Sequence, residues 1–188
     1  MITRYPLAVG IADLMSFGQE LRSAADVDLT CFMGPWRVIA CMDNAMEREM
    51  VDAVETYMLR EDGSIEVHFR WREKSFTAEE KAFESVCQVA GGSTNAQWKA
   101  ALFPLLSARF SILAVHPQYE WAAMAHPSRK FGWVLSRGRA MEARDYREAL
   151  RVFEHQGFDI RSFIKIPQFV RREKYSGICL PQASFKCA

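Results

Sequence analysis

The pattern of hydrophobic positions in this chain of 188 residues is mostly that of short strands. Between 64 and 72, apolar and polar residues alternate without a break, the period of a strand with one buried face. Arg60-Glu-Asp-Gly63, just before it, has the composition of a hairpin turn, so 51–59 is predicted to be the antiparallel partner. Further short strands are predicted at 80–88, 96–103, 109–115, 119–125 and 131–136.

The segments between the later strands have the chemistry of tight turns. Gly91-Gly92-Ser93, His116-Pro117-Gln118 and His126-Pro127-Ser128 combine residues that favour turns and end strands. Many short strands joined by tight connections indicate an antiparallel meander. Closing such a meander into a barrel removes its exposed edges.

Two segments have a helical period instead. In 142–155, Tyr146, Ala149, Leu150 and Phe153 form one apolar stripe, and Gly157 follows as a stop signal. A single amphipathic helix after a barrel is expected to pack its stripe on the outside of that barrel. A shorter amphipathic helix is predicted at 11–22, before the first strand.

The composition, 49% hydrophobic and 25% charged, is that of one soluble globular domain. The net charge of +1 hides an asymmetry, since residues 1–128 are acidic overall and 129–188 are basic. This asymmetry fits either a basic docking surface or two parts that neutralise each other in the fold. Nothing in the sequence points to nucleic acid as a partner.

The chain has neither a secretory signal pattern nor an apolar run of the ~20 residues that a membrane span needs. We therefore expect an intracellular or organellar setting, or a processed chain that is peripheral to a membrane.

Catalytic and metal-binding chemistry finds little support. The four histidines are scattered, and the five cysteines lack the spacing of a metal site. The neighbouring carboxylates Glu47/Glu49 and Glu79-Glu80 are expected to be solvated. We predict no catalytic residue, no metal ligand and no required cofactor.

Several segments together resemble the lipocalin family, and within it the bacterial outer-membrane group with its plant and animal relatives. They are Gly34-Pro-Trp-Arg-Val-Ile-Ala40, Glu47-Arg48, Tyr57-Met-Leu-Arg-Glu-Asp-Gly63, Gly132-Trp-Val-Leu-Ser-Arg137, Gly157-Phe-Asp-Ile160 and Phe163-Ile-Lys-Ile-Pro-Gln168. The resemblance covers residues 27–168. It implies an all-β fold, an eight-stranded antiparallel up-and-down β-barrel with a C-terminal α-helix packed on the outside. Residues 1–26 would then be an N-terminal extension, and 169–188 a basic C-terminal tail.

The resemblance also assigns structural roles. Gly34 and Trp36 would begin the first strand and Arg137 would end the last, so that the guanidinium covers the indole and closes the barrel floor. Most of the five cysteines are expected to be buried or free thiols. A disulfide between Cys87 and either Cys179 or Cys187, which would resemble secreted lipocalins, is left open.

The family's strand parity implies which side chains face the interior and could bind a ligand. These are Val67, Phe69, Trp71, Trp98, Phe110, Ile112, Ala114, Ala123, Ala125 and Trp133, with Ala100 and Phe131 also facing inward. The three alanines on neighbouring strands would leave room, and the aromatic residues opposite would form rigid walls. The implied function is binding and transport of a small hydrophobic molecule: a fatty acid, lysolipid or pigment.

Two other functions remain open at this point. The chain could be a non-catalytic subunit of a larger, membrane-associated complex that docks through 11–22, the apolar loop 103–106 and 169–188. The third alternative is a lipocalin-fold isomerase, cyclase or de-epoxidase. It is disfavoured because the pattern places no catalytic group inside the barrel.

Overall fold

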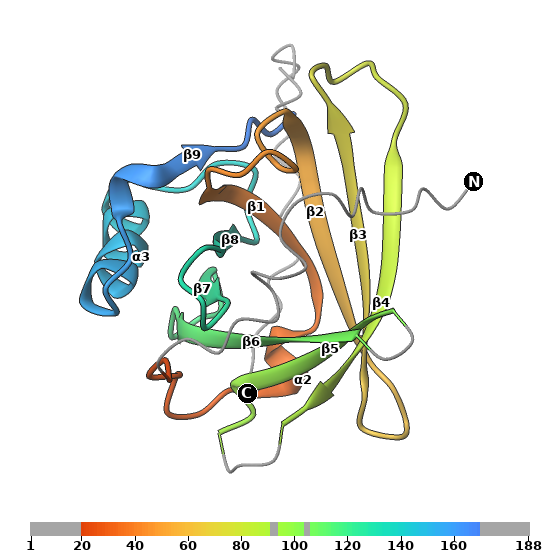
Figure 1. Ribbon diagram of the computed structural model, residues 1–188, viewed down its shortest axis with the longest axis vertical. Coiled ribbons are helices and arrows are strands. Elements are labelled where there is room, and N and C mark those ends of the chain that lie inside the picture. Colours follow the sequence, from red (N-terminus) through yellow and green to blue (C-terminus); the bar gives the residue numbers. More distant parts are fainter. Residues whose placement is uncertain (1–19, 91–93, 104–105, 170–188) are drawn as a thin grey trace, which may run out of the picture.

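Short antiparallel strands, each paired with the next along the chain, build almost the whole molecule (Figure 1). The computed structural model describes residues 20–90, 94–103 and 106–169. The elements within these ranges are α2 (Leu29–Phe32), β1 (Gly34–Met42), β2 (Met50–Leu59), β3 (Ile65–Glu73), β4 (Lys81–Val89), β5 (Gln97–Phe103), β6 (Leu106–Val115), β7 (Trp121–Ala125), β8 (Gly132–Ser136), α3 (Ala143–His155), a 3-10 turn (Ile160–Ser162) and β9 (Phe163–Lys165).

The sheet closes on itself at β1. The first part of β1 pairs with β2, from Gly34 opposite Tyr57 to Arg37 opposite Val54. The second part pairs with β8, as far as Cys41 opposite Trp133. Since β2 to β8 are paired in chain order, the result is the predicted closed antiparallel barrel of eight strands.

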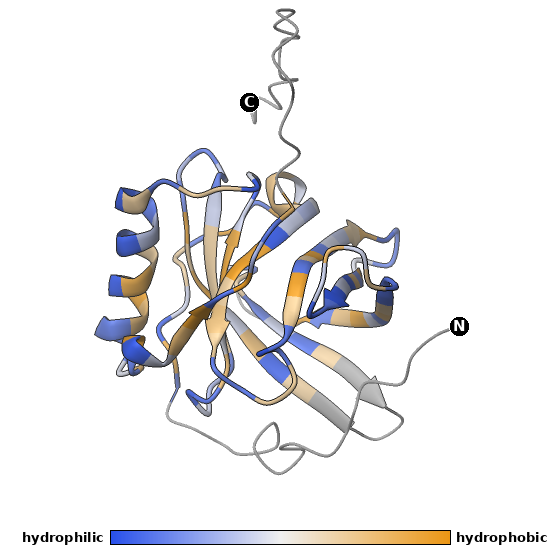
Figure 2. Ribbon diagram, turned by 90° about the horizontal axis from the view of Figure 1, so that it is seen from above, coloured by the Kyte–Doolittle hydropathy of each residue, from blue (hydrophilic) through white to orange (hydrophobic). Residues whose placement is uncertain are grey.

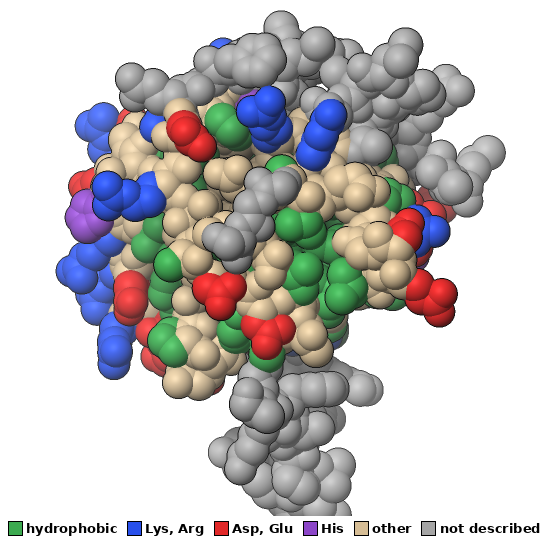
Figure 3. Space-filling model, turned by 90° about the horizontal axis from the view of Figure 1, so that it is seen from below, with side chains coloured by type: hydrophobic (Ala, Val, Ile, Leu, Met, Phe, Trp, Pro, Cys, Tyr) green, Lys and Arg blue, Asp and Glu red, His purple; other side chains and the backbone are tan. Residues whose placement is uncertain are grey.

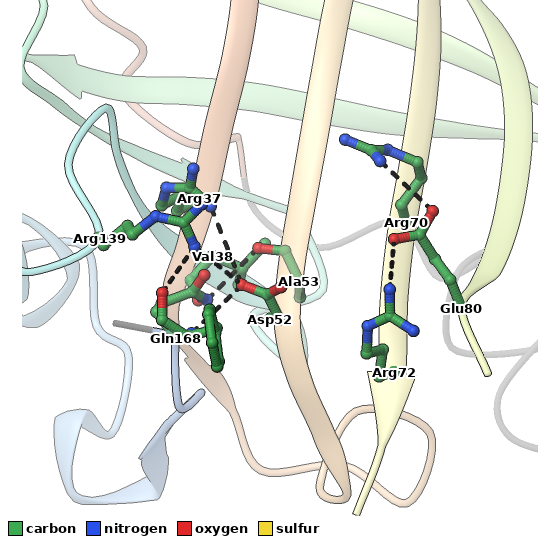
Figure 4. A network of polar contacts seen from close by, with 10 residues as sticks. Arg37, Val38, Asp52, Ala53, Arg70, Arg72, Glu80, Arg139 and Gln168 are labelled. Carbon is green, nitrogen blue, oxygen red and sulfur yellow. Dashed lines mark hydrogen bonds and ion pairs between the residues drawn. The ribbon is translucent and has the colours of Figure 1, made fainter. Parts of the chain in front are cut away.

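The C-terminal segment completes the wall where β2 diverges from β1. The short strand β9 pairs with β1 over Ala40–Met42. Beyond it the backbone N–H of Asp52 donates to the carbonyl of Pro167, at a bulge of β2 where Asp52 has a φ of 52°. The Gln168 amide then donates to the carbonyl of Val38 on β1 at 2.8 Å and to that of Ala53 on β2 at 3.4 Å (Figure 4). Residues 163–168 are therefore part of the barrel wall.

Charged side chains cover this junction on the outside of the barrel. The Asp52 carboxylate lies 3.5 Å from the Arg139 guanidinium and 4.0 Å from that of Arg37 (Figure 4). On β3, Arg70 and Arg72 both pair with Glu80. The partly exposed ion pairs contribute little stability one by one, whereas the backbone contacts of the C-terminal segment satisfy groups that would otherwise be unpaired.

Two separate apolar clusters divide the core. One lies on the inner faces of the strands, inside the barrel, and the other lies between the outer faces of the strands and α3. Ala149 and Phe153, from the predicted stripe, are buried in the outer cluster, with Tyr146 and Leu150 packed against it. Figure 2 shows the hydrophobic side of α3 turned toward the barrel and its hydrophilic side turned away. The helix therefore packs on the outside of the barrel, as predicted.

The outer face of α3 is strongly charged. Arg144, Arg147 and Arg151 are exposed there together with Glu148 and Glu154. Figure 3, which views the end where Figure 1 places α2, shows Lys and Arg side chains gathered on the α3 side. Some of the basic residues of the C-terminal part of the chain therefore lie on the outer face of α3, where acidic residues are interspersed with them.

One end of the barrel is closed by α2 and the aromatic residues above it. Asp28 caps this helix by accepting hydrogen bonds from the backbone N–H groups of Thr30 and Cys31. The Phe32 ring packs on Trp36, Tyr57 and Trp98, with centroid distances of 5.0, 5.4 and 5.3 Å. We call this end the floor and the opposite end, with the β1–β2 and β7–β8 loops, the mouth.

Arg137 holds the floor together. Its guanidinium lies 3.8 Å from the centroid of the Trp36 ring. It also donates to four carbonyls, those of Cys31, Phe32, Met33 and Pro35. Gly34 adopts a φ of 94°, and a Cβ at this position would lie 3.4 Å from the Arg137 Nη1 atom. The positive φ and the close approach both favour glycine here.

Each strand predicted from the hydrophobic pattern is present within about three residues, and so is the long helix. The predicted helix at 11–22 lies outside the described residues except for its last three positions, which are not helical. The tail at 170–188 also lies outside them. In the described part of the chain, no helix has the length and apolar character needed to cross a membrane.

We expect Arg137→Lys to lower the free energy of unfolding by about 2–4 kcal/mol, because an ammonium cannot reach four carbonyls and cover the ring at once. Urea denaturation followed by tryptophan fluorescence measures the change. Arg139→Lys, at an exposed position 3.5 Å from Asp52, is the matched control and should cost less than about 1 kcal/mol. Equal effects of the two substitutions would contradict this role of Arg137.

Candidate ligand site inside the barrel

Aromatic side chains form the walls of the lumen, the space enclosed by the inward faces of β1 to β8. On β3, Val67, Phe69 and Trp71 all belong to the inner cluster, and the rings of Phe69 and Trp71 stack at 4.8 Å. On the opposite side Phe110 of β6 and Trp133 of β8 meet at 5.7 Å. These residues come from strands far apart in the sequence and face a common interior.

The inner surface is not completely covered. Phe83, Phe110 and Trp133 face inward but remain only half-buried, whereas Trp36 and Ile112, deeper in the same cluster, are fully buried. The surface that these three inward side chains keep accessible indicates space between the walls of the barrel. That space lies toward the mouth, above the packed floor.

Trp98 belongs to the floor rather than to the open part of the lumen. Its ring lies 5.3 Å from both Phe32 and Tyr57, and its indole N–H donates to the Asn95 carbonyl at 2.8 Å. It is buried and faces inward, but a ligand would meet other residues first.

The expectation that Ala114, Ala123 and Ala125 face the lumen is wrong. Ala123 and Ala125 are buried in the outer cluster with Phe153 of α3, and Ala114 packs against that cluster. On β7 it is Ala122 and Met124 that face inward. Because β7 is buried on both faces, its sequence carries no alternation that marks the inner side. A bulge of β6 between Ile112 and Ala114 also shifts the parity there.

Glu47 is the first of two carboxylates that the structure places in the interior. It is only 6% exposed, and its carboxylate accepts hydrogen bonds from the Trp133 indole at 2.8 Å and the Asn44 amide at 2.6 Å. Burial is the main cause that raises its pKa. The contact with Trp133 fastens the β1–β2 loop to β8 at the mouth. The expectation that Glu47 is solvated is therefore wrong.

Glu55 is the second interior carboxylate, and it lies deeper. It is paired with Trp36 on β1 and with Phe69 on β3, and the neighbouring residue on its face of β2 is Tyr57. The Tyr57 hydroxyl donates a hydrogen bond to the Glu55 Oε2 atom. Burial first, and the nearby Glu47 carboxylate as well, raise the pKa of Glu55 to about 7.

Sequence reasoning missed Glu55 although a signal for it existed. Ala53, Glu55 and Tyr57 alternate along β2, and the register set by the Arg60–Gly63 turn places them on the same face as Val67. Following that register from β3 to β2 would have located the carboxylate inside the barrel.

Cys41 and Cys87 are buried free thiols, as expected for most of the cysteines. Cys87 is free and buried in the inner cluster, so a disulfide from Cys87 to Cys179 or Cys187 is contradicted. Cys31 is disulfide-bonded instead. Cys87 points into the barrel from β4, where burial raises its pKa to about 12. Its thiol is protonated at neutral pH.

In the described part of the chain, no three His, Cys, Asp or Glu side chains come together as a metal site would require. The segments proposed for docking to a complex cannot be placed, since most of 11–22 and 169–188, and the side chains of the 103–106 loop, lie outside the described residues.

Comparison with known proteins agrees with the barrel fold. Residues 27–168 match the family model of the lipocalin-like domain. The chain is 28% identical over 144 residues to the outer membrane lipoprotein Blc of Escherichia coli (strain K12), covering 75% of this chain and 79% of the relative. It is 25% identical over 166 residues to temperature-induced lipocalin-1 of Arabidopsis thaliana, covering 82% and 86%. Among solved structures, insecticyanin of the tobacco hornworm Manduca sexta is similar in fold. The TM-score is 0.64 at 17% identity, over 83% of this chain and 88% of that one.

The interior position of Glu55 should make stability depend on pH. Its pKa is about 7 in the folded protein against an ordinary value of 4.5, so folding favours the protonated form and stability falls as the pH rises from about 4.5 to 7. At pH 8 we expect the free energy of unfolding of Glu55→Gln to exceed that of the parent protein by about 1–3 kcal/mol. The variant should therefore unfold at a higher urea concentration. The difference should vanish near pH 4.5. Glu61→Gln, in an exposed turn, should show neither effect.

Glu47→Leu should lower the free energy of unfolding by about 1–3 kcal/mol, because the Trp133 indole and the Asn44 amide lose their acceptor. Glu47→Gln keeps an acceptor oxygen and should retain most of the stability. Urea denaturation of the two variants compares them directly. A Gln variant as unstable as the Leu variant would assign the effect to the charge rather than to the hydrogen bonds.

Proposed function

The chain belongs to the lipocalin family, and we propose that it binds and carries a small hydrophobic molecule, of the size of a lipid or pigment, in the lumen of its barrel. Lipocalins typically bind small hydrophobic ligands. The observation that carries the proposal is a lumen closed at the floor and lined toward the mouth by aromatic residues that remain only half-buried.

Burial of an apolar ligand in the lumen would supply enough free energy for binding. Burying about a dozen methylene groups at ~0.8 kcal/mol each contributes on the order of 10 kcal/mol. Association costs of about 4–15 kcal/mol offset much of this gain. The walls are rigid because Phe69 stacks on Trp71 and Phe131 stacks on Trp133, so little ordering is needed when a ligand enters. Binding in the micromolar range or tighter is the expected outcome.

Organic extraction of the protein from its native source, followed by mass spectrometry and an absorption spectrum, identifies the ligand class. We expect a stoichiometric apolar molecule in the extract. Protein that is empty both after native purification and after incubation with apolar probes would contradict the proposal.

Ser85 offers a direct way to block the lumen. It is paired with the inward residue Val67, so both share the inner face of the sheet, and it is small and half-buried. We expect Ser85→Trp to reduce binding of the fluorescent apolar probe N-phenyl-1-naphthylamine at least tenfold. Glu84→Trp places the same ring on the outer face of the same strand and should leave binding unchanged. Circular dichroism checks that both variants are folded.

A further inference from the structure

The interior carboxylate Glu55 has one oxygen engaged and one available. Its Oε2 atom accepts the Tyr57 hydroxyl, whereas no residue in the described ranges donates a hydrogen bond to its Oε1 atom. Glu55 faces inward between Trp36 and Phe69 yet is only half-buried, while both of those neighbours are buried. The accessible part of Glu55 therefore borders the open lumen.

Its depth places Glu55 where the open lumen meets the floor. Toward the floor, Tyr57 is buried against Phe32 and Trp98, and its hydroxyl lies 3.7 Å from the Met124 sulfur. Toward the mouth, the next inward residue on β3 is Trp71. A ligand that enters through the mouth thus passes apolar walls and meets a hydrogen-bond acceptor at its inner end.

We propose that Glu55, oriented by Tyr57, binds the terminal hydrogen-bond donor of an elongated apolar ligand, an amine or a hydroxyl, which enters the lumen first. This inference rests on the proposed carrier function and narrows the class of its ligand. A molecule that ends in a carboxylate would place like charges together in an apolar space and is disfavoured.

The surrounding charges agree with this preference. Glu47, in the β1–β2 loop, lies close enough to contribute to the raised pKa of Glu55, so the interior is acidic. Cys87, on β4, is neutral at physiological pH. Arg137 is a cation that acts on Tyr57, and hydrogen bonds to the floor carbonyls hold its guanidinium. A ligand that carries a cationic or neutral hydrogen-bond donor would complement this acidic interior.

Tyr57 is the positioning residue of the site. Its hydroxyl holds one carboxyl oxygen, and no hydrogen bond to the second oxygen occurs among the described residues. Removing the hydroxyl in Tyr57→Phe keeps the ring in the floor and frees the carboxylate to rotate. We therefore expect Tyr57→Phe to reduce selectivity between ligand termini more than it reduces binding of the apolar probe.

The test compares three ligands of equal chain length: dodecylamine, dodecanol and dodecanoic acid. Each displaces N-phenyl-1-naphthylamine from the parent protein and from Glu55→Gln, Glu55→Ala and Glu84→Ala at pH 8. In the parent protein and in Glu84→Ala, the amine and the alcohol should bind about tenfold or more tighter than the acid. Glu55→Gln should lose the advantage of the amine and reduce that of the alcohol, because the charge that repels the acid is gone. Glu55→Ala should also remove the hydrogen bond to the alcohol.

A pH series adds a second readout. Protonation of Glu55 at pH 5 should narrow the gap between amine and acid in the parent protein more than in Glu55→Gln, where only the ligands titrate. Equal affinity for the three ligands in the parent protein, or an unchanged order in Glu55→Ala, would overturn the head-group site while leaving the carrier function intact. If the parent protein does not bind the probe, or if none of the three ligands displaces the probe from it, the carrier function itself fails.

Discussion

The whole structure depends on closing one antiparallel sheet through β1. A strand with an unpaired edge exposes backbone groups, and β1 avoids this by pairing with β2, β8 and β9 in turn along its length. The bulge between Val38 and Ala40 lets the strand change partners. Because β9 and the segment up to Gln168 complete the wall, this C-terminal part of the domain belongs to the barrel itself.

Closure at the floor leaves a lumen open at one end only. Arg137 donates hydrogen bonds to four carbonyls at the floor, one of which also accepts from the Trp36 indole, and its guanidinium covers the Trp36 ring. The aromatic cluster of Phe32, Tyr57 and Trp98 fills the space above. Any ligand is therefore restricted to the upper part of the barrel, between the mouth and Glu55.

The interior is less uniformly apolar than a simple hydrophobic core. Burying a carboxyl group is unfavourable unless it is protonated or hydrogen-bonded, and the two interior acids meet this requirement differently. Glu47 has donors at both sides and links the mouth loop to β8. Glu55 has one donor and a raised pKa. The first is satisfied within the fold, whereas the second keeps an oxygen for a ligand.

The sequence by itself determined the barrel, because the alternation at 64–72, the turn at 60–63 and the stripe of α3 are local patterns imposed by the geometry of strands and helices. It also indicated the floor residues through Gly34, Trp36 and Arg137. Only the tertiary structure decided which faces of β6 and β7 line the lumen, since bulges shift parity and a strand covered on both sides has no polar face. The same holds for Glu47 and Glu55, because an acid is solvated or buried according to what the other strands place around it.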